Sequence, residues 1–328
     1  MQAKKQGLNI SSLTLAWTAL IGNLVVILQG AVVRATGSGA GCGSHWPTCN
    51  GEVIPLAHTT ESIIEFSHRL LSLVVLILGA WLLRRVWQSR RENRGLFVWG
   101  SAAFFFLIIE ALLGAATVLF GLTGENVSMA RGLMVATHLI NSLLLVGTLT
   151  LTVIYASKKR PAWPLKLGQQ GTVLTVLALG LLGMLVLMFS GGIAAMGNTM
   201  FPSESLREGI AADFDPTSHP LIRLRILHPL IAITVGIYLF LSLGLGRLLK
   251  PVSEARPYVQ ALFLVYVIQL LIGTLNLAFL APTALQLLHL FTAVLSFALL
   301  TAVVIYTLGF EASSRSRRFT PSIPAKEL

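Results

Sequence analysis

The chain has 328 residues, of which 55% are hydrophobic and only 11% are charged. A soluble domain carries about 25% charged residues, so this composition excludes an ordinary soluble protein and indicates a membrane protein. The net charge of +11 does not indicate a nucleic-acid-binding protein. Its basic residues lie in short clusters between apolar runs, whereas a nucleic-acid site needs a continuous basic surface.

Eight apolar runs follow one another, and each is long enough to cross a bilayer as a helix. They cover residues 12–33, 63–83, 96–120, 132–155, 171–193, 226–248, 258–280 and 285–309. The first run follows a lysine pair, as in a signal peptide. It is too long for one and lacks a small-residue cleavage site, so we expect a retained helix. The predicted fold class is an all-α integral membrane protein.

Lysine and arginine predict the orientation of these helices. With the N-terminus in the cytoplasm, the inside segments are 1–11, 84–95, 156–170, 249–257 and 310–328. Most of the 24 lysine and arginine residues lie in these segments or at the adjoining helix ends. The positive-inside rule therefore predicts that both termini are cytoplasmic. The long segments 34–61 and 194–224 then lie outside.

The two halves of the chain resemble each other. Each half has a histidine near the outer start of its second helix and another near the start of its fourth: His68 and His138, then His228 and His289. The third helices carry Glu-Ala-Leu-Leu-Gly at 110–114 and Gln-Leu-Leu-Ile-Gly at 269–273. We therefore predict two tandem four-helix bundles, residues 1–160 and 161–328. A pseudo-twofold axis along the membrane normal would relate them.

The four histidines inside the spans are candidate haem ligands. Ionisable residues inside a membrane are costly and usually functional. All four are predicted at one depth, two in each half, and a helix bundle can clamp a macrocycle between imidazoles of different helices. The alternative for each histidine is an interfacial side chain that is hydrogen-bonded to a neighbouring carbonyl. This alternative could account for a single histidine, but it accounts poorly for four at one depth. Zinc fits less well, because a structural site needs four converging ligands. His45, His58 and His219 are expected to be solvated loop residues.

Glu65 precedes His68 by three residues, so both side chains lie on one helix face. It is a candidate for proton handling, although an acid at a helix N-terminus is also favoured by the helix dipole. Arg225 occupies the matching position in the second half, which suggests that the first half is the reactive one. Glu110, in the middle of the third span, is compatible with a neutral hydrogen-bonded acid or with a proton path.

Four arginines near the outer helix ends are candidate partners for anionic haem propionates: Arg34, Arg69, Arg131 and Arg225. Snorkelling to the interface is the alternative for each of them. Cys42 and Cys49 share the first outside segment, which in bacteria faces an oxidising compartment. We therefore predict a disulfide between them.

Three stretches of the first half resemble the haem A synthase family. They are Gly-Ala-Val-Val-Arg-Ala-Thr-Gly-Ser-Gly at 30–39, Trp-Pro-Thr-Cys-Asn-Gly at 46–51 after Cys42, and Glu-Phe-Ser-His-Arg at 65–69. His138, His228 and His289 fit the same pattern. The resemblance implies an oxidoreductase that converts the C8 methyl group of haem O to the formyl group of haem A by successive hydroxylations, for cytochrome oxidase.

The resemblance also implies roles for the two halves. His68 and His138 would flank the substrate haem, with Glu65 as the essential acid, and His228 and His289 would ligate a cofactor haem b. Some cysteine-containing members have a second cysteine pair between helices 5 and 6, which this sequence lacks.

Location and partners follow from the same resemblance. The expected location is the bacterial plasma (inner) membrane, and the expected partners are haem O synthase, cytochrome oxidase assembly factors and an unidentified electron donor. A homo-oligomer is compatible with the sequence, and no nucleic acid is expected. The alternative function is a di-haem b-type, quinol-oxidising electron-transfer subunit, but such subunits usually place their haems near opposite membrane faces. A transporter would need a polar midplane site, where only Glu110 lies.

Overall fold

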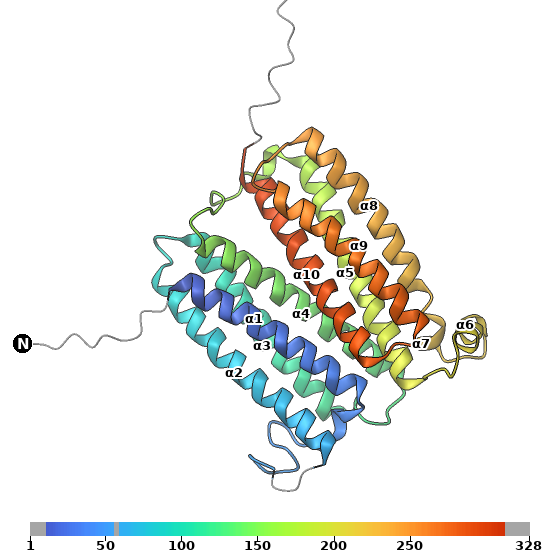
Figure 1. Cartoon of the computed structure of the whole chain (residues 1–328). Helices are drawn as coiled ribbons and strands as arrows, with labels where there is room; N and C mark the ends of the chain where they lie inside the picture. The colour runs from blue at the N-terminus through green and yellow to red at the C-terminus, as the bar shows by residue number, and fades with distance from the viewer. Residues whose placement is uncertain (1–10, 56–58, 312–328) are drawn as a thin grey trace, which may run out of the picture.

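The computed structural model describes residues 11–55 and 59–311, and this part of the chain is helical (Figure 1). The long helices are α1 (Ser12–Ala35), α2 (Thr60–Gln88), α3 (Arg94–Leu119), α4 (Met129–Ala156), α5 (Gly171–Met200), α8 (Leu227–Leu249), α9 (Arg256–Ala278) and α10 (Thr283–Gly309). Within the described residues, eight segments are long and apolar enough to cross a membrane. The sixth, Pro220–Gly246, includes α7 and most of α8. The predicted all-α, multi-pass membrane fold is confirmed. His58 and the charged residues of both termini lie outside the described residues.

The helices begin where polar side chains can cap them. Ser11, Thr59 and Ser128 each accept a hydrogen bond from a backbone N–H in the first turn of α1, α2 and α4. Such caps satisfy backbone donors that have no partner within the helix. The caps of α2 and α4 lie before the predicted starts of these helices, because the predicted boundaries followed apolar residues only.

The largest departure from the predicted boundaries is the end of α5, which was expected at residue 193 and lies at Met200. The extra turns pack against the following segment: a Cβ on Gly197 would lie 2.8 Å from the backbone oxygen of Leu221. The predicted outside segment 194–224 is therefore partly helical. It contains α6 (Leu206–Phe214) and α7 (Pro220–Arg223), and the latter leads directly into α8.

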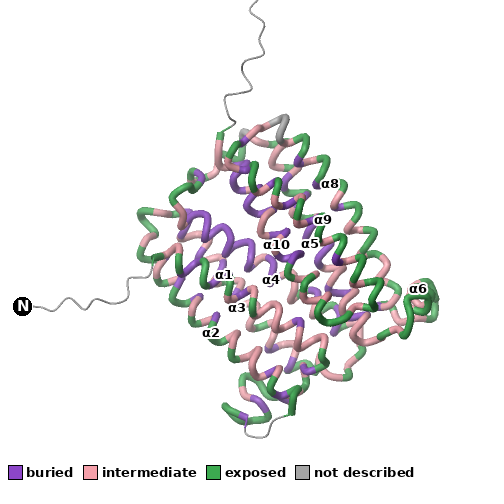
Figure 2. The backbone as a smooth tube through the Cα atoms, viewed as in Figure 1, coloured by how far each residue is buried: buried purple, intermediate pink, exposed green. Residues whose placement is uncertain are grey.

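Helices α1 to α4 form one four-helix set, in which each helix packs on the next and α4 returns to α1. Helices α5, α8, α9 and α10 form a second set with the same order of neighbours. The sets meet where α4 contacts α5 and α10 and where α1 contacts α10 (Figure 1). Long buried stretches lie in α4 and α10, so these two helices form the centre of the core (Figure 2). The pseudo-twofold axis stays a prediction.

Candidate functional site

The four candidate ligand histidines lie toward the same end of the molecule, which we call the histidine end. It is the end at which α1 stops and α2 begins. His68, His138 and His289 lie about two turns inside α2, α4 and α10. His228 lies at the start of α8, but α7 extends the span in front of it. The four histidines thus lie at similar positions along their spans, and their depth in a membrane stays a prediction.

The histidines come together as two pairs, one in each four-helix set. The ring centroids of His228 and His289 are 6.1 Å apart, and their planes are nearly perpendicular at 83°. His68 and His138, on α2 and α4, lie within range of an electrostatic interaction with each other. Two imidazoles that bind one metal ion from opposite sides, each at about 2 Å, have ring centres about 6 Å apart. The second pair has this spacing.

A glycine of the preceding long helix lies beside each histidine, a feature that the sequence analysis did not identify. A Cβ at Gly30 would lie 3.1 Å from Cε1 of His68, and a Cβ at Gly191 would lie 3.0 Å from Cε1 of His228. A Cβ at Gly273 would lie 2.8 Å from Cε1 of His289. At Gly114 the corresponding distance to His138 is 3.9 Å. Glycines at matching places in both halves thus make room for the imidazoles. Two of them are the final glycines of the repeated pentapeptides at 110–114 and 269–273, and Gly30 begins the stretch at 30–39.

Two of the ring nitrogens support a bound metal. Nδ1 of His68 and Nδ1 of His289 are buried and have no hydrogen-bond partner within the described part of the chain. A buried polar atom without a partner needs an explanation, and an absent ion or ligand is one. In the second pair, the unpartnered nitrogen of His289 and the spacing of the rings fit a haem iron between the imidazoles. In the first pair, the unpartnered nitrogen of His68 and the glycine beside it are the matching features.

Glu110 lies beside His138, and the sequence analysis left its role open. Nε2 of His138 is 3.2 Å from the backbone oxygen of Glu110 and 3.3 Å from its Oε1. The side-chain amide of Asn141 donates to Oε2 at 2.5 Å, and the hydroxyl of Ser142 donates to Oε1. The carboxylate is therefore a hydrogen-bonded neighbour of a candidate ligand. This contact joins α3 to α4.

Gln269 occupies the matching place in the second set. Its amide nitrogen lies 3.3 Å from Nε2 of His289, and its Oε1 accepts a hydrogen bond from the hydroxyl of Thr292. In the second pair, Nδ1 of His228 lies 3.1 Å from the hydroxyl of Ser190. The two histidine pairs thus share a framework but differ in the residue beside the histidine of the fourth helix, which is an acid in one case and an amide in the other.

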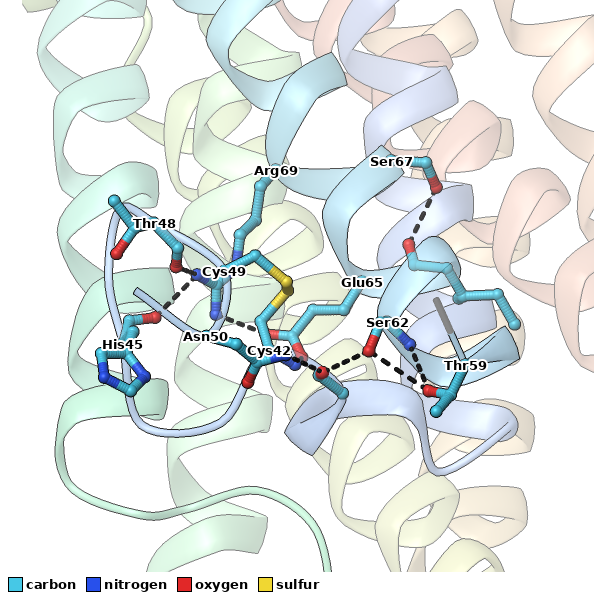
Figure 3. Close-up of a disulfide and its surroundings, with 12 residues drawn as sticks. Cys42, His45, Thr48, Cys49, Asn50, Thr59, Ser62, Glu65, Ser67 and Arg69 are labelled. Carbon is cyan, nitrogen blue, oxygen red and sulfur yellow. Dashed lines mark hydrogen bonds and ion pairs between the residues drawn. A yellow bond between two sulfur atoms is a disulfide. The ribbon is translucent and has the colours of Figure 1, made fainter. Parts of the chain in front are cut away.

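Glu65 is buried and faces the first loop rather than open space (Figure 3). Its Oε2 accepts a hydrogen bond from the backbone N–H of Cys42 at 2.9 Å, and its Oε1 pairs with Arg69 at 2.5 Å. The other end of the Arg69 guanidinium donates to the backbone oxygens of His45 and Thr48. Glu65 and Arg69 thus fasten the loop to α2.

The predicted disulfide between Cys42 and Cys49 is confirmed, and both cysteines are fully buried. Close packing holds the loop on the start of α2. A Cβ on Gly41 would lie 2.4 Å from the backbone of Glu61, and the hydroxyl of Ser62 donates to the oxygen of Gly41 at 2.6 Å. The disulfide and the Glu65–Arg69 pair therefore form one structural unit at the histidine end of the first set (Figure 3).

The other three predicted propionate partners have different surroundings. Arg34 of α1 bridges the two sets, because it donates to Thr199 of α5 at 2.6 Å and to Gln286 of α10 at 2.7 Å. Arg131 is buried and donates to backbone oxygens of the turn before α4. Arg225 pairs with Asp213 of the segment around α6 at 2.7 Å. Among the described residues, no carboxylate forms an ion pair with Arg34 or Arg131.

One loop histidine has a more definite place than expected. His219 accepts a hydrogen bond from the backbone N–H of Leu221 at the start of α7, and its ring packs on Phe201 at 5.0 Å. It is thus part of the connection between α5 and α8. A cap of this kind could not be recognised in the sequence because α7 was not predicted.

Comparison with known proteins gives a family match and relatives with two different names. The model of the COX15-CtaA family, described as cytochrome oxidase assembly protein, matches residues 13–302. Proteins named Protoheme IX farnesyltransferase from two strains of Thermus thermophilus are 45% identical over 282 residues, which are 85% of this chain and 45% of theirs. A Heme A synthase of Lysinibacillus sphaericus is 46% identical over 110 residues, 32% of this chain and 34% of its own. A Heme A synthase of Halalkalibacterium halodurans is 38% identical over 165 residues, which are 48% of this chain and 52% of its own. The chain spans about half, or less, of the length of these relatives.

Proposed function

The chain belongs to the COX15-CtaA family of cytochrome oxidase assembly proteins, and we propose that it is a haem A synthase. The reaction would oxidise the C8 methyl group of haem O to a formyl group by successive hydroxylations and give haem A. The observation that carries the proposal is the pair of imidazoles in each four-helix set, each ring lying beside a glycine. Relatives named Heme A synthase support it.

We assign the substrate site to the first set, residues 1–160, between His68 and His138. These imidazoles would hold the haem substrate near the histidine end, where its apolar tail could extend into the bilayer. Glu65, His68 and His138 form the proposed catalytic group. Because Glu65 is bonded to the backbone of Cys42 and to Arg69, its contribution would combine an acidic group near the site with the fixed position of the covering loop.

We assign a resident haem b to the second set, residues 161–328, with His228 and His289 as iron ligands. When bound, haem b would supply one-electron transfer to the substrate site. The protein residues would set its orientation and burial, which are the features through which a protein tunes a haem. Ser190 would hold the ring of His228 through Nδ1, which lies 3.1 Å from its hydroxyl.

Arg34 and Arg131 are the better supported partners for haem propionates. Both are cationic, and within the described residues neither has an acidic partner, so an anionic group between the sets would supply the missing charge. Arg69 and Arg225 already pair with Glu65 and Asp213. A propionate would have to share these two guanidinium groups with the existing ion pairs.

The proposed location is the bacterial plasma (inner) membrane, with the histidine end outside and both termini in the cytoplasm. The disulfide supports this orientation, because disulfides persist in oxidising compartments. An enzyme that makes haem O is the proposed partner, together with cytochrome oxidase assembly factors, an electron donor and the lipid bilayer. The Thermus relatives support a link to farnesyl transfer: they are named Protoheme IX farnesyltransferase, and more than half of their length lies beyond the match.

The test is the haem content of the purified full chain, produced in cells that make haem O. Haem b together with haem O or haem A is expected, and added haem O should be converted to haem A under turnover conditions. Two results together would instead support a di-haem electron-transfer subunit. The purified protein would hold only b haems, and a strain from which the gene is deleted would still make an oxidase that contains haem A. The shared depth of both histidine pairs is unfavourable to that alternative, because electrons would not be carried across the membrane.

A further inference from the structure

Glu110 directly contacts a candidate ligand: its Oε1 lies 3.3 Å from Nε2 of His138. Both carboxylate oxygens already accept hydrogen bonds, one from Asn141 and one from Ser142. These donors come from α4, the helix that carries His138, three and four residues farther along. These two hydrogen bonds therefore fix the carboxylate relative to the imidazole.

This surrounding leaves one chemical form for the ring. Nε2 of His138 faces two acceptors, the backbone oxygen and the carboxylate of Glu110. A backbone oxygen can only accept a hydrogen bond, so Nε2 carries the hydrogen and donates it. Nδ1 of His138 is then the nitrogen with a free lone pair.

The second set provides an internal comparison. Gln269 lies beside His289 in the position that Glu110 has beside His138, and Thr292 holds it as Asn141 and Ser142 hold Glu110. An amide carries both a donor and an acceptor, so after a half-turn it can face either form of the ring. The side chain of Glu110 has no amide group and cannot make this exchange.

We propose that Glu110 is the positioning residue of His138, and that its hydrogen bond strengthens Nδ1 as a ligand for the substrate iron. Metal-bound histidines commonly donate their second ring N–H to a carboxylate, which fixes the ring and raises the basicity of the coordinating nitrogen. The two halves would thus hold their haems with unequal ligand strength. The inference rests on the proposed function for the identity of the ligand.

The experiment uses the full chain with His289→Ala, so that the first histidine pair is the haem site that remains. Haem b is titrated into detergent-solubilised protein, and its affinity and low-spin spectrum are measured with and without Glu110→Gln. The expected result is a weakening of about 10- to 100-fold, the usual effect of losing such a partner, with a changed spectrum. Ser142→Ala, which removes one support of the carboxylate, should give a smaller change in the same direction.

The matched control is Gln269→Glu in a His68→Ala background, which places a carboxylate beside the second pair. The spectrum of that pair should shift toward the spectrum of the first. Unchanged affinity and spectrum with Glu110→Gln in the His289→Ala background would overturn the inference. If both pairs bind haem and Glu110→Gln acts as expected but haem O is not oxidised, the proposed function fails while the positioning role stands.

Discussion

Gly273 of α9 lies directly against the imidazole of His289 in α10, so that a Cβ at this position would approach Cε1 to 2.8 Å. Contacts below 3.0 Å force one of the groups to move, and overpacking of this kind costs about 1–3 kcal/mol. Gly273→Ala should therefore displace the ring and weaken haem b at the second pair by roughly tenfold or more. Absorbance of the reduced b haem in the purified protein is the measurement.

Gly244→Ala is the matched control for this change. Gly244 lies in α8, and a Cβ there would meet nothing within 4 Å. Helix propensity favours alanine over glycine by about 1 kcal/mol, so this variant should fold at least as well and keep its b haem. Full haem b in Gly273→Ala would refute the assigned role of the glycine.

Substitutions at Glu65 and at the second pair should have separable effects. His228→Ala or His289→Ala removes a proposed ligand and should abolish the b-haem spectrum. Glu65→Ala lies in the other four-helix set and should leave that spectrum intact while conversion of haem O is lost. Loss of the b haem in Glu65→Ala, in a protein of native helix content, would contradict the assignment of the two halves.

The sequence was sufficient for the long helices and for the disulfide. Runs of about 20 apolar residues have few structural alternatives in a membrane, and two cysteines in one outside loop have an obvious partner in each other. The placement of His138 at the depth of His68 also followed from the helix pattern. The roles of these histidines stay predictions, because a position on a helix does not reveal what the side chain binds.

Contacts between helices were not predictable from the sequence. The neighbour of Glu110 depends on how α3 is rotated against α4, and periodicity is weak in a helix that is apolar on all sides. The bridge from Arg34 to α5 and α10 depends on the packing of the two sets. The end of α5 was missed because Gly197 and its neighbours pack on a segment that was expected to be a loop.

The disulfide should stabilise the first loop without controlling the second histidine pair. Cys42→Ser with Cys49→Ser opens a short covalent ring, a change worth about 2–3 kcal/mol of local stability. The freed loop would loosen its hydrogen bonds with Glu65 and Arg69. Limited proteolysis should then cut between residues 42 and 55 faster than in the unmodified protein.

The b-haem spectrum serves as the control for the double cysteine variant and should not change. The same resistance to proteolysis with and without the disulfide would show that the hydrogen bonds of Glu65 and Arg69 suffice to hold the loop. Arg69→Gln, which removes the donors to the backbone oxygens of His45 and Thr48, should increase cleavage even with the disulfide intact.

Arg34 should matter to both haem sites because it joins the two sets. Arg34→Gln loses donors to Thr199 and Gln286 and removes a cation that has no carboxylate partner among the described residues. If an anionic propionate supplies that partner, haem loss should accompany the loss of stability. If the residue only ties the helices, stability should fall by about 1–3 kcal/mol with haem affinity unchanged. Haem titration and thermal unfolding of the same preparation separate these outcomes. Arg223→Gln, at the exposed last residue of α7, is the control that should affect neither.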